Sequence, residues 1–71
     1  SDILSPMPGM VSKIYIGNGC KVLKGQRILA LEAMKMEYEV IAPNDCFVKT
    51  VNFEVGDFVQ SGTKLCDFSE V

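Results

Sequence analysis

The segment "LALEAMKMEYEV" (residues 29–40) decides the fold, because two alternating runs meet in it around a charged centre. In 29–32 and again in 36–40, apolar side chains alternate with polar ones, which is the period of a β-strand. Both apolar sets reach the same face of a hairpin if a two-residue turn at Met34 and Lys35 joins the runs. Turns shifted by one residue to either side satisfy the same parity, so the alternation alone leaves three turns open.

The turn at Met34-Lys35 conflicts with rules that the other turns obey. Two-residue hairpin turns favour Asn-Gly or other Gly-containing pairs, because their backbone must reach positive φ. The same register pairs Leu31 with Tyr38. It also sets Glu32 opposite Glu37, a like-charge pair. A lysine at a turn is most often a solvated charge and a methionine most often a gap filler, so a purely structural interpretation stays open. A local conflict of this kind is still where a functional site is expected.

The chain repeats itself at a constant offset of 37 residues, which aligns 5–31 with 42–68 without a gap. Of the 27 aligned pairs five are identical, where ordinary composition gives about one or two. The identical pairs are Pro6 and Pro43, Val11 and Val48, Gly19 and Gly56, Val22 and Val59, and Gly25 and Gly62. Two copies are too few for an open array of repeats, so we expect them to close one core with pseudo-twofold symmetry.

Short runs rich in Val, Ile and Phe alternate with turn-forming residues along the whole chain. The runs cover 10–16, 27–32, 37–42, 46–53 and 64–69. No window carries a long helical period with caps. The sequence therefore predicts an all-β fold, a flattened barrel or sandwich of two small antiparallel sheets. Residues 1–71 are too few for more than one domain or for a large internal cavity, so any site should lie on the surface.

Composition excludes several classes of function. The net charge is −2 and no basic run occurs, so we expect neither nucleic acid nor an anionic membrane as a partner. No apolar stretch approaches the roughly 20 residues that span a bilayer. Cys20, Cys46 and Cys66 are odd in number, form no CxxC pair and have no His beside them, which predicts neither a disulfide framework nor a metal site. A reducing compartment follows as the expectation.

Two motifs resemble those of one family. The motif "EAMKME" (32–37) resembles the biotin attachment motif of biotin-dependent carboxylases and decarboxylases. The motif "SPMPGMV" (5–11) resembles the opening of the same biotinyl, or biotin carboxyl carrier, domains, and the similarity covers nearly the whole chain with its duplication. The gapless match of 17–19 with 54–56 leaves no room for the inserted thumb of the separate bacterial acetyl-CoA carboxylase carrier. The chain thus looks more like the carrier segment of an acyl-CoA carboxylase alpha subunit or of pyruvate carboxylase.

Two departures from the family pattern concern turns away from the hairpin. Cys46 stands where the first half has Gly9, and Cys20 stands where the second half has Asp57. They put local geometry in doubt and leave the attachment motif intact.

The resemblance implies a carrier rather than a catalyst. Lys35 would accept biotin through an amide made by a biotin protein ligase, on an exposed hairpin turn of a biotinyl/lipoyl-like fold. A biotin carboxylase site would load the attached biotin, and a carboxyltransferase site would unload it. The residues that partner surfaces would read are Met34 and Met36, with Ala33, Glu32 and Glu37 beside them. No residue of the chain is expected to be catalytic. We expect an intracellular location, cytoplasmic in a bacterium and the mitochondrial matrix in a eukaryote.

Two other functions stay open. A lipoyl carrier domain of a 2-oxo acid dehydrogenase shares the fold and the hairpin lysine, but its motif usually has Asp before the lysine and Ala or Val after it. A Cu(I) site is the other, because thioethers are soft ligands. Its ligands would be Met7, Met10, Met34 and Met36. The repeat alignment does not bring these four together.

Overall fold

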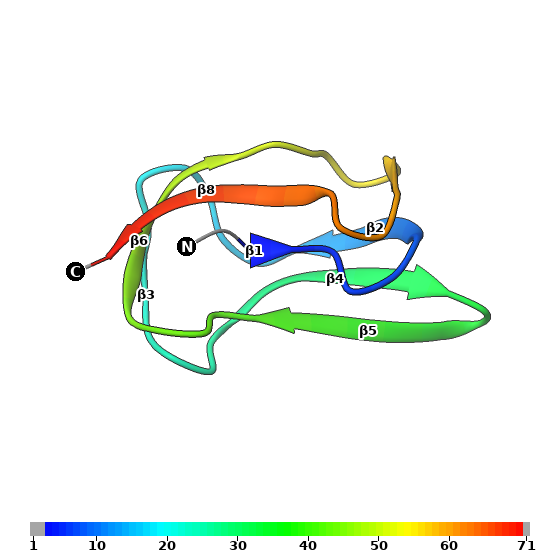
Figure 1. The fold of residues 1–71 in the computed structure, drawn as a ribbon, viewed down its shortest axis with the longest axis horizontal. Helices are drawn as coiled ribbons and strands as arrows, with labels where there is room; N and C mark the ends of the chain where they lie inside the picture. The colour runs from blue at the N-terminus through cyan, green and yellow to red at the C-terminus, as the bar shows by residue number, and fades with distance from the viewer. Residues whose placement is uncertain (1–2, 71) are drawn as a thin grey trace.

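The computed structural model describes residues 3–70, which form strands joined by turns and contain no helix (Figure 1). The strands are β1 (Ile3–Leu4), β2 (Gly9–Ile14), β3 (Lys21–Val22), β4 (Arg27–Ala33), β5 (Met36–Ile41), β6 (Cys46–Val51), β7 (Phe58–Val59) and β8 (Lys64–Glu70). Residues 3–70 therefore include no helical segment that could span a membrane. Residues 1, 2 and 71 of the expected domain lie outside the description.

The strands make two four-stranded antiparallel sheets that face each other. One sheet has the order β1-β8-β6-β3 and the other β5-β4-β2-β7. The prediction of an all-β fold with two small antiparallel sheets is confirmed. The expected strands 10–16 and 46–53 are too long, since β2 ends at Ile14 and β6 at Val51. The short strands β1, β3 and β7 were not predicted, because two residues are too few to show an alternating pattern.

The two sheets repeat each other at the offset of 37 seen in the sequence. β2 corresponds to β6, β3 to β7, and β4 to β8. Even the irregularities correspond, because the register shifts between Val11 and Lys13 in one sheet and between Val48 and Thr50 in the other. A bulge that recurs at the same place in both halves is a feature of the fold rather than a local accident. The structure thus has the pseudo-twofold symmetry expected of two copies around one core.

Aliphatic side chains from both sheets fill the space between them. The most completely buried large side chains are Val11, Val22, Ile28, Leu29, Leu31, Val48, Val59 and Leu65. The apolar run 46–53 predicts a core position for Val51, but Val51 is only half-buried and packs at the margin of this core. The reason is its position at the end of β6, where the chain leaves the sheet.

The three cysteines form no disulfide and lie in different surroundings. Cys46 and Cys66 are buried in the core, and Cys20 is exposed. Burial raises the pKa of the Cys66 thiol to about 11, and the nearby Asp67 carboxylate adds to the shift. Cys66 is therefore a neutral apolar side chain at physiological pH, as a core position requires.

Candidate functional site

The hairpin of β4 and β5 carries the candidate site at one end of the molecule. It reaches the right-hand extreme of the 34 Å long axis in Figure 1. The register pairs Leu31 with Tyr38 and Ala33 with Met36, which confirms the two-residue turn among the three that the alternation allowed. Lys35 occupies the second position of this turn, and its side chain is exposed.

Exposure rises steadily along the inner face of β5 toward the turn. Val40 is 7% exposed, Tyr38 47% and Met36 73%. These three side chains share one face, because they occupy alternate positions of a strand. The hairpin therefore begins inside the core and ends outside it. Tyr38 was expected on the core face, and it does lie on that face but at the point where the core ends.

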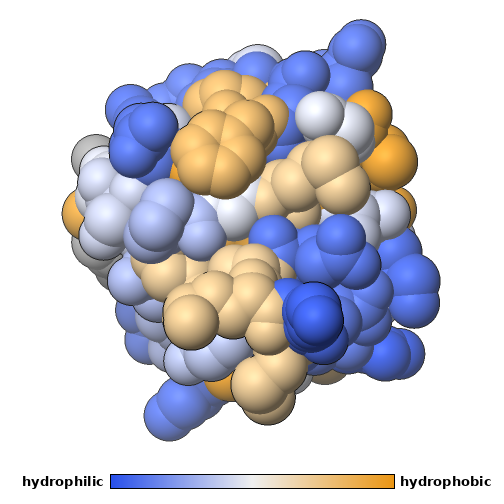
Figure 2. All heavy atoms as spheres, turned by 90° about the vertical axis from the view of Figure 1, so that its right-hand side faces the viewer, coloured by the Kyte–Doolittle hydropathy of each residue, from blue (hydrophilic) through white to orange (hydrophobic). Residues whose placement is uncertain are grey.

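The turn itself is strained. Met34 has φ 52° and Lys35 has φ 66°, both in the left-handed region that a two-residue hairpin turn requires. For residues other than glycine this region costs about 1–2 kcal/mol each. Met34 gains nothing by burial in return, since it is 95% exposed. The face seen in Figure 2, which looks at the hairpin end, mixes apolar with hydrophilic side chains.

Ion pairs and hydrogen bonds hold the outer face of the hairpin. The carboxylate of Glu37 lies 3.6 Å from the Lys13 ammonium and accepts a hydrogen bond from the Ser12 hydroxyl at 3.1 Å. These contacts offset the like-charge pairing of Glu37 with Glu32, which the register confirms. Glu32 is exposed on the same face. Such surface pairs are individually worth about 0–1 kcal/mol, so their main effect is to fix the position of β5.

Farther from the tip of the hairpin, three side chains form a second cluster. The Arg27 guanidinium lies 3.4 Å from the Glu39 carboxylate and 4.8 Å from the centre of the Tyr15 ring. The Tyr15 hydroxyl donates to Glu39 at 3.4 Å. Desolvation, and then this hydrogen bond, raise the pKa of Tyr15. Sequence reasoning missed this cluster, because its members lie 12 and 24 residues apart and no local motif joins them.

Gly9 supports the base of the hairpin. A Cβ built on Gly9 would lie 2.9 Å from the backbone oxygen of Glu32 and 3.4 Å from the Cβ of Ala33. Only glycine therefore lets β2 approach β4 at the point where the hairpin leaves the core. This gives the glycine of the "SPMPGMV" motif a physical role that the sequence did not reveal. In the sequence, the one signal for this role is that the aligned position of the second half holds Cys46 and not glycine.

The residues expected at the site thus lie together but point in different directions. Met34 and Lys35 form the exposed turn, Met36 is exposed on the inner face, and Glu32 and Glu37 are exposed on the outer face. Ala33 is half-buried at the base of the turn. Met10 pairs with Glu32 and so lies on the outer face, opposite to Met36. Met10 and Met36, two of the four methionines of the Cu(I) hypothesis, therefore lie on opposite faces of the sheet.

Known proteins resemble this chain in sequence. The chain is 44% identical over 63 residues to the biotin carboxyl carrier protein of acetyl-CoA carboxylase from Solanum lycopersicum, covering 89% of this chain and 90% of that protein. It is 41% identical over 63 residues to the alpha subunit of mitochondrial methylcrotonoyl-CoA carboxylase from Glycine max, of which it spans only 9%.

Solved structures show the same fold. A single-chain, multi-domain long-chain acyl-CoA carboxylase matches with a TM-score of 0.93 and 25% identity, over 100% of this chain and 7% of that one. The lipoyl domain of the 2-oxoglutarate dehydrogenase complex from Azotobacter vinelandii matches with a TM-score of 0.78 and 28% identity, over 89% of this chain and 80% of that one. The family described as "Biotin-requiring enzyme" matches residues 1–68. The chain therefore belongs to the family of biotin-requiring enzymes.

Proposed function

We propose that the chain is a biotin carboxyl carrier domain and that biotin is joined to the Nζ of Lys35. The observation that carries the proposal is the place of Lys35, exposed at the tip of a projecting hairpin within "EAMKME". An amine that must enter the active sites of other proteins needs such a position. Membership of the biotin-requiring family supplies the identity of the group.

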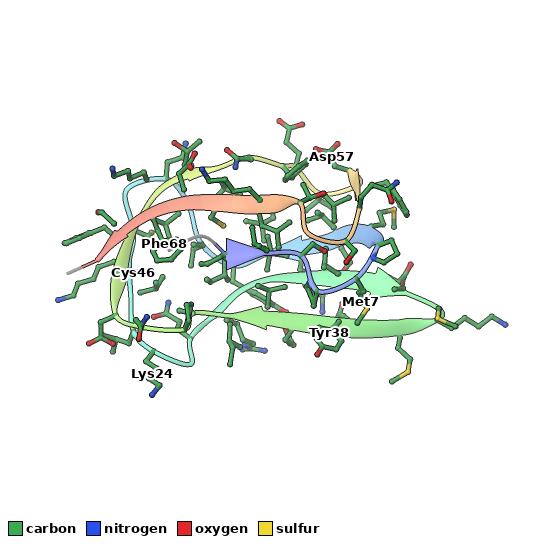
Figure 3. All side chains as sticks on the ribbon, viewed as in Figure 1. Met7, Lys24, Tyr38, Cys46, Asp57 and Phe68 are labelled. Atoms are coloured by element: carbon green, nitrogen blue, oxygen red, sulfur yellow. The ribbon has the colours of Figure 1, made fainter. Side chains whose placement is uncertain are left out.

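The surroundings of Lys35 fit an attachment site better than those of three other lysines that the structure describes. Lys13 and Lys64 are engaged in ion pairs with Glu37 and Asp67. Lys24 lies at the opposite end of the molecule from the hairpin (Figure 3). Among the lysines within residues 3–70, Lys35 alone has a positive φ, and it follows Met34, which has one too.

The attachment step follows from ordinary acyl transfer. A biotin protein ligase would supply biotin as an acyl-adenylate, and the deprotonated Nζ of Lys35 would attack its carbonyl carbon. The amide C–N bond forms, the bond to the adenylate oxygen breaks, AMP leaves with the electron pair, and the amine proton passes to solvent. The net charge of the chain changes from −2 to −3, since one ammonium is lost.

The bound biotin would supply the ureido nitrogen that takes up and releases a carboxyl group. The chain contributes reach and a high effective concentration of that group at two partner sites. Because the chain spans only a small part of the carboxylase subunit from Glycine max, those partner sites would belong to other domains or subunits, a biotin carboxylase and a carboxyltransferase. Exposed Met34 and Met36 offer flexible apolar surface that can adapt to both.

The parent enzyme is inferred to be of the acyl-CoA or pyruvate carboxylase class. The connections between β2 and β3 and between β6 and β7 cover 15–20 and 52–57 and match at the offset of 37. Neither connection carries an insertion that the other lacks. This supports the resemblance to carrier segments without a thumb.

A lipoyl carrier is the second candidate, because the lipoyl domain of the 2-oxoglutarate dehydrogenase complex shares the fold. The two functions are separated by incubating the chain with ATP and biotin plus a biotin protein ligase, and in parallel with ATP and lipoate plus a lipoate ligase. Intact mass should increase by one biotinyl group in the first mixture and stay unchanged in the second. Lipoyl transfer without biotinyl transfer would overturn the proposed function.

A further inference from the structure

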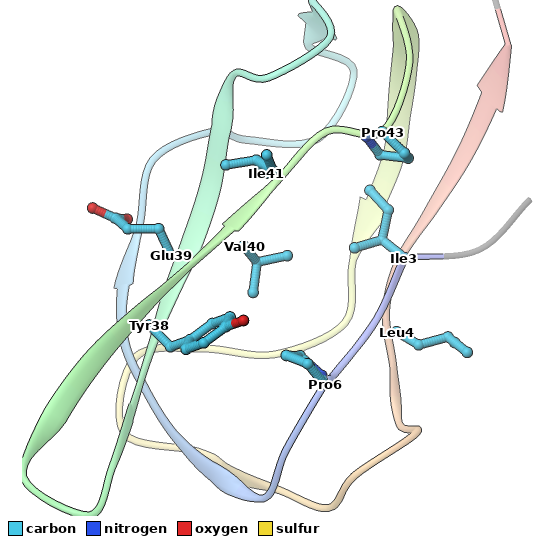
Figure 4. Close-up of a pocket in the computed structure, with 8 residues that line it drawn as sticks. All are labelled: Ile3, Leu4, Pro6, Tyr38, Glu39, Val40, Ile41 and Pro43. Carbon is cyan, nitrogen blue, oxygen red and sulfur yellow. The ribbon is translucent and has the colours of Figure 1, made fainter.

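An open apolar groove of about 400 Å³ runs between the edge strands of the two sheets, β5 and β1 (Figure 4). Its walls include Leu4 and Pro6 from one side and Tyr38, Val40 and Ile41 from the other. The volume lies within the range of roughly 300–1,000 Å³ that is typical of small-molecule sites. Nothing in the carrier role described above uses this groove.

We propose that the groove is a resting site for the biotinyl group carried by Lys35 of the same chain; this rests on the proposed function. The first support is continuity. Met36, Tyr38 and Val40 share one face of β5, so an uninterrupted apolar stripe leads from the turn into the groove. Figure 4 shows the Tyr38 ring directed toward Pro6, while Glu39 points away from the space between them.

The second support is reach. Tyr38 lies three positions beyond Lys35, which is about 10 Å along a strand. The arm from the Lys35 Cα to the biotin ring contains roughly ten bonds, so it reaches roughly 12 Å when extended. The ring can therefore meet Tyr38 when the arm folds back along β5. A tethered group has an effective concentration of order mM for a site within its reach, so weak contacts suffice to populate the groove.

The third support is chemical. The valeryl chain and sulfur-containing ring of biotin are apolar and suit walls of Leu4, Pro6 and Val40, whereas the ureido group needs hydrogen-bond partners. β5 is terminal in its sheet. Residues beside a two-residue turn exchange their backbone bonds with the partner strand, so Glu37 and Glu39 direct N–H and C=O groups outward from β5. An exposed strand edge offers one donor and one acceptor per such residue, which is the pairing that a ureido group uses.

As a consequence, the biotinyl arm is accessible to partner proteins for only part of the time. A partner site must compete with the groove to bind it. A protein that captures only the extended arm then binds at a reduced rate. That rate is proportional to the fraction of time for which the arm is free. If the arm rests in the groove half of the time or more, removing the groove should at least double the capture rate.

The test compares the unmodified and the biotinylated chain by NMR, after intact mass and peptide mapping have located one biotin on Lys35. We expect chemical-shift changes and biotin-ring NOEs at the Tyr38 ring and at the Leu4 and Val40 methyl groups. In Tyr38→Ser the NOEs should disappear, and the rate of capture by avidin should rise at least twofold. Phe58→Ser is the matched control, because Phe58 is an exposed aromatic side chain on β7, at the opposite edge of the same sheet.

Leu4→Ser provides a second groove variant at an exposed position in the other sheet, should Tyr38→Ser disturb the hairpin. Shift changes confined to residues 33–37, with no NOE to the groove, would overturn the proposal. So would equal capture rates in wild type and both groove variants. A chain that takes no biotin on Lys35 would instead refute the proposed function and this proposal with it, so the two failures are distinguishable.

Discussion

The turns of this molecule fall into two groups that solve the same backbone problem differently. Gly19 and Gly56 occupy corresponding turns of the two halves at φ 80° and 100°, and Gly25 and Gly62 another corresponding pair at 86° and 80°. The hairpin turn reaches the same region of φ with Met34 and Lys35. Glycine visits this region at no steric cost, whereas other residues lose about 1–2 kcal/mol each.

The residues at the hairpin tip are therefore not those that would minimise backbone strain. Four turns that only reverse the chain carry the residue that relaxes them. The hairpin turn, for which we propose the attachment of biotin, carries two residues that leave it strained. Strain of this kind persists where the surroundings hold it, and here the ladder with β4 and the ion pairs of Glu37 and Glu39 do so.

The largest expected effect comes from loosening the hairpin at its base. Leu31 is fully buried and pairs with Tyr38, so Leu31→Ala should lower the free energy of unfolding by about 3 kcal/mol through loss of burial and the cavity left behind. Val51→Ala, at a half-buried position, should cost only about 1 kcal/mol. Chemical denaturation measures both values. A larger loss in Val51→Ala would show that the core is centred elsewhere.

A smaller loss is expected from crowding the same base. Gly9→Ala places a Cβ 2.9 Å from the Glu32 backbone oxygen, so β2 and β4 must separate, at a cost of about 2 kcal/mol. Gly17→Ala is the control, because a Cβ there meets nothing within 4 Å. Its stability should change by less than about 0.5 kcal/mol. Urea titration of the two variants checks the contrast, and equal values would remove the special role given to Gly9.

How much of this could be predicted from the sequence depends on the distance between the residues concerned. The alternation in 29–40 limits the hairpin to three registers, and the paired sheets follow from the repeat. The contact of Gly9 with β4 and the cluster of Tyr15, Arg27 and Glu39 could not be predicted, because both arise only when distant strands pair. The groove between β5 and β1 likewise depends on how the two sheets are closed.

Replacing the hairpin turn by a relaxed one should have an effect of opposite sign. The double substitution Met34→Asn with Lys35→Gly gives the pair that two-residue turns favour, and it should raise the free energy of unfolding by about 1.5 kcal/mol. Thermal and chemical denaturation provide the measurement. A destabilised double variant would mean that Met34 and Lys35 stabilise the turn by contacts other than those seen. Lys35→Ala, which keeps a side chain at positive φ, should stay within about 0.5 kcal/mol of wild type.

The smallest expected change in stability accompanies a change in partner recognition. Replacing Met34 and Met36 together by Leu conserves volume and apolarity at exposed positions, so the free energy of unfolding should shift by less than about 0.5 kcal/mol. Biotin attachment should be equally complete by intact mass. The initial rate with which a biotin carboxylase uses the loaded domain should fall severalfold, because the flexible thioethers are lost. Equal rates would reduce the Met pair to filler of the turn.

If the strained turn serves to present the amine of Lys35, biotin must be attached to that residue and to no other lysine. Wild type, Lys35→Ala and Lys24→Ala are each incubated with a biotin protein ligase, ATP and biotin, then digested and mapped by mass spectrometry. We expect one biotinyl group on Lys35 in wild type and in Lys24→Ala, and none in Lys35→Ala. A label on Lys24 or Lys64, or undiminished labelling of Lys35→Ala, would contradict it.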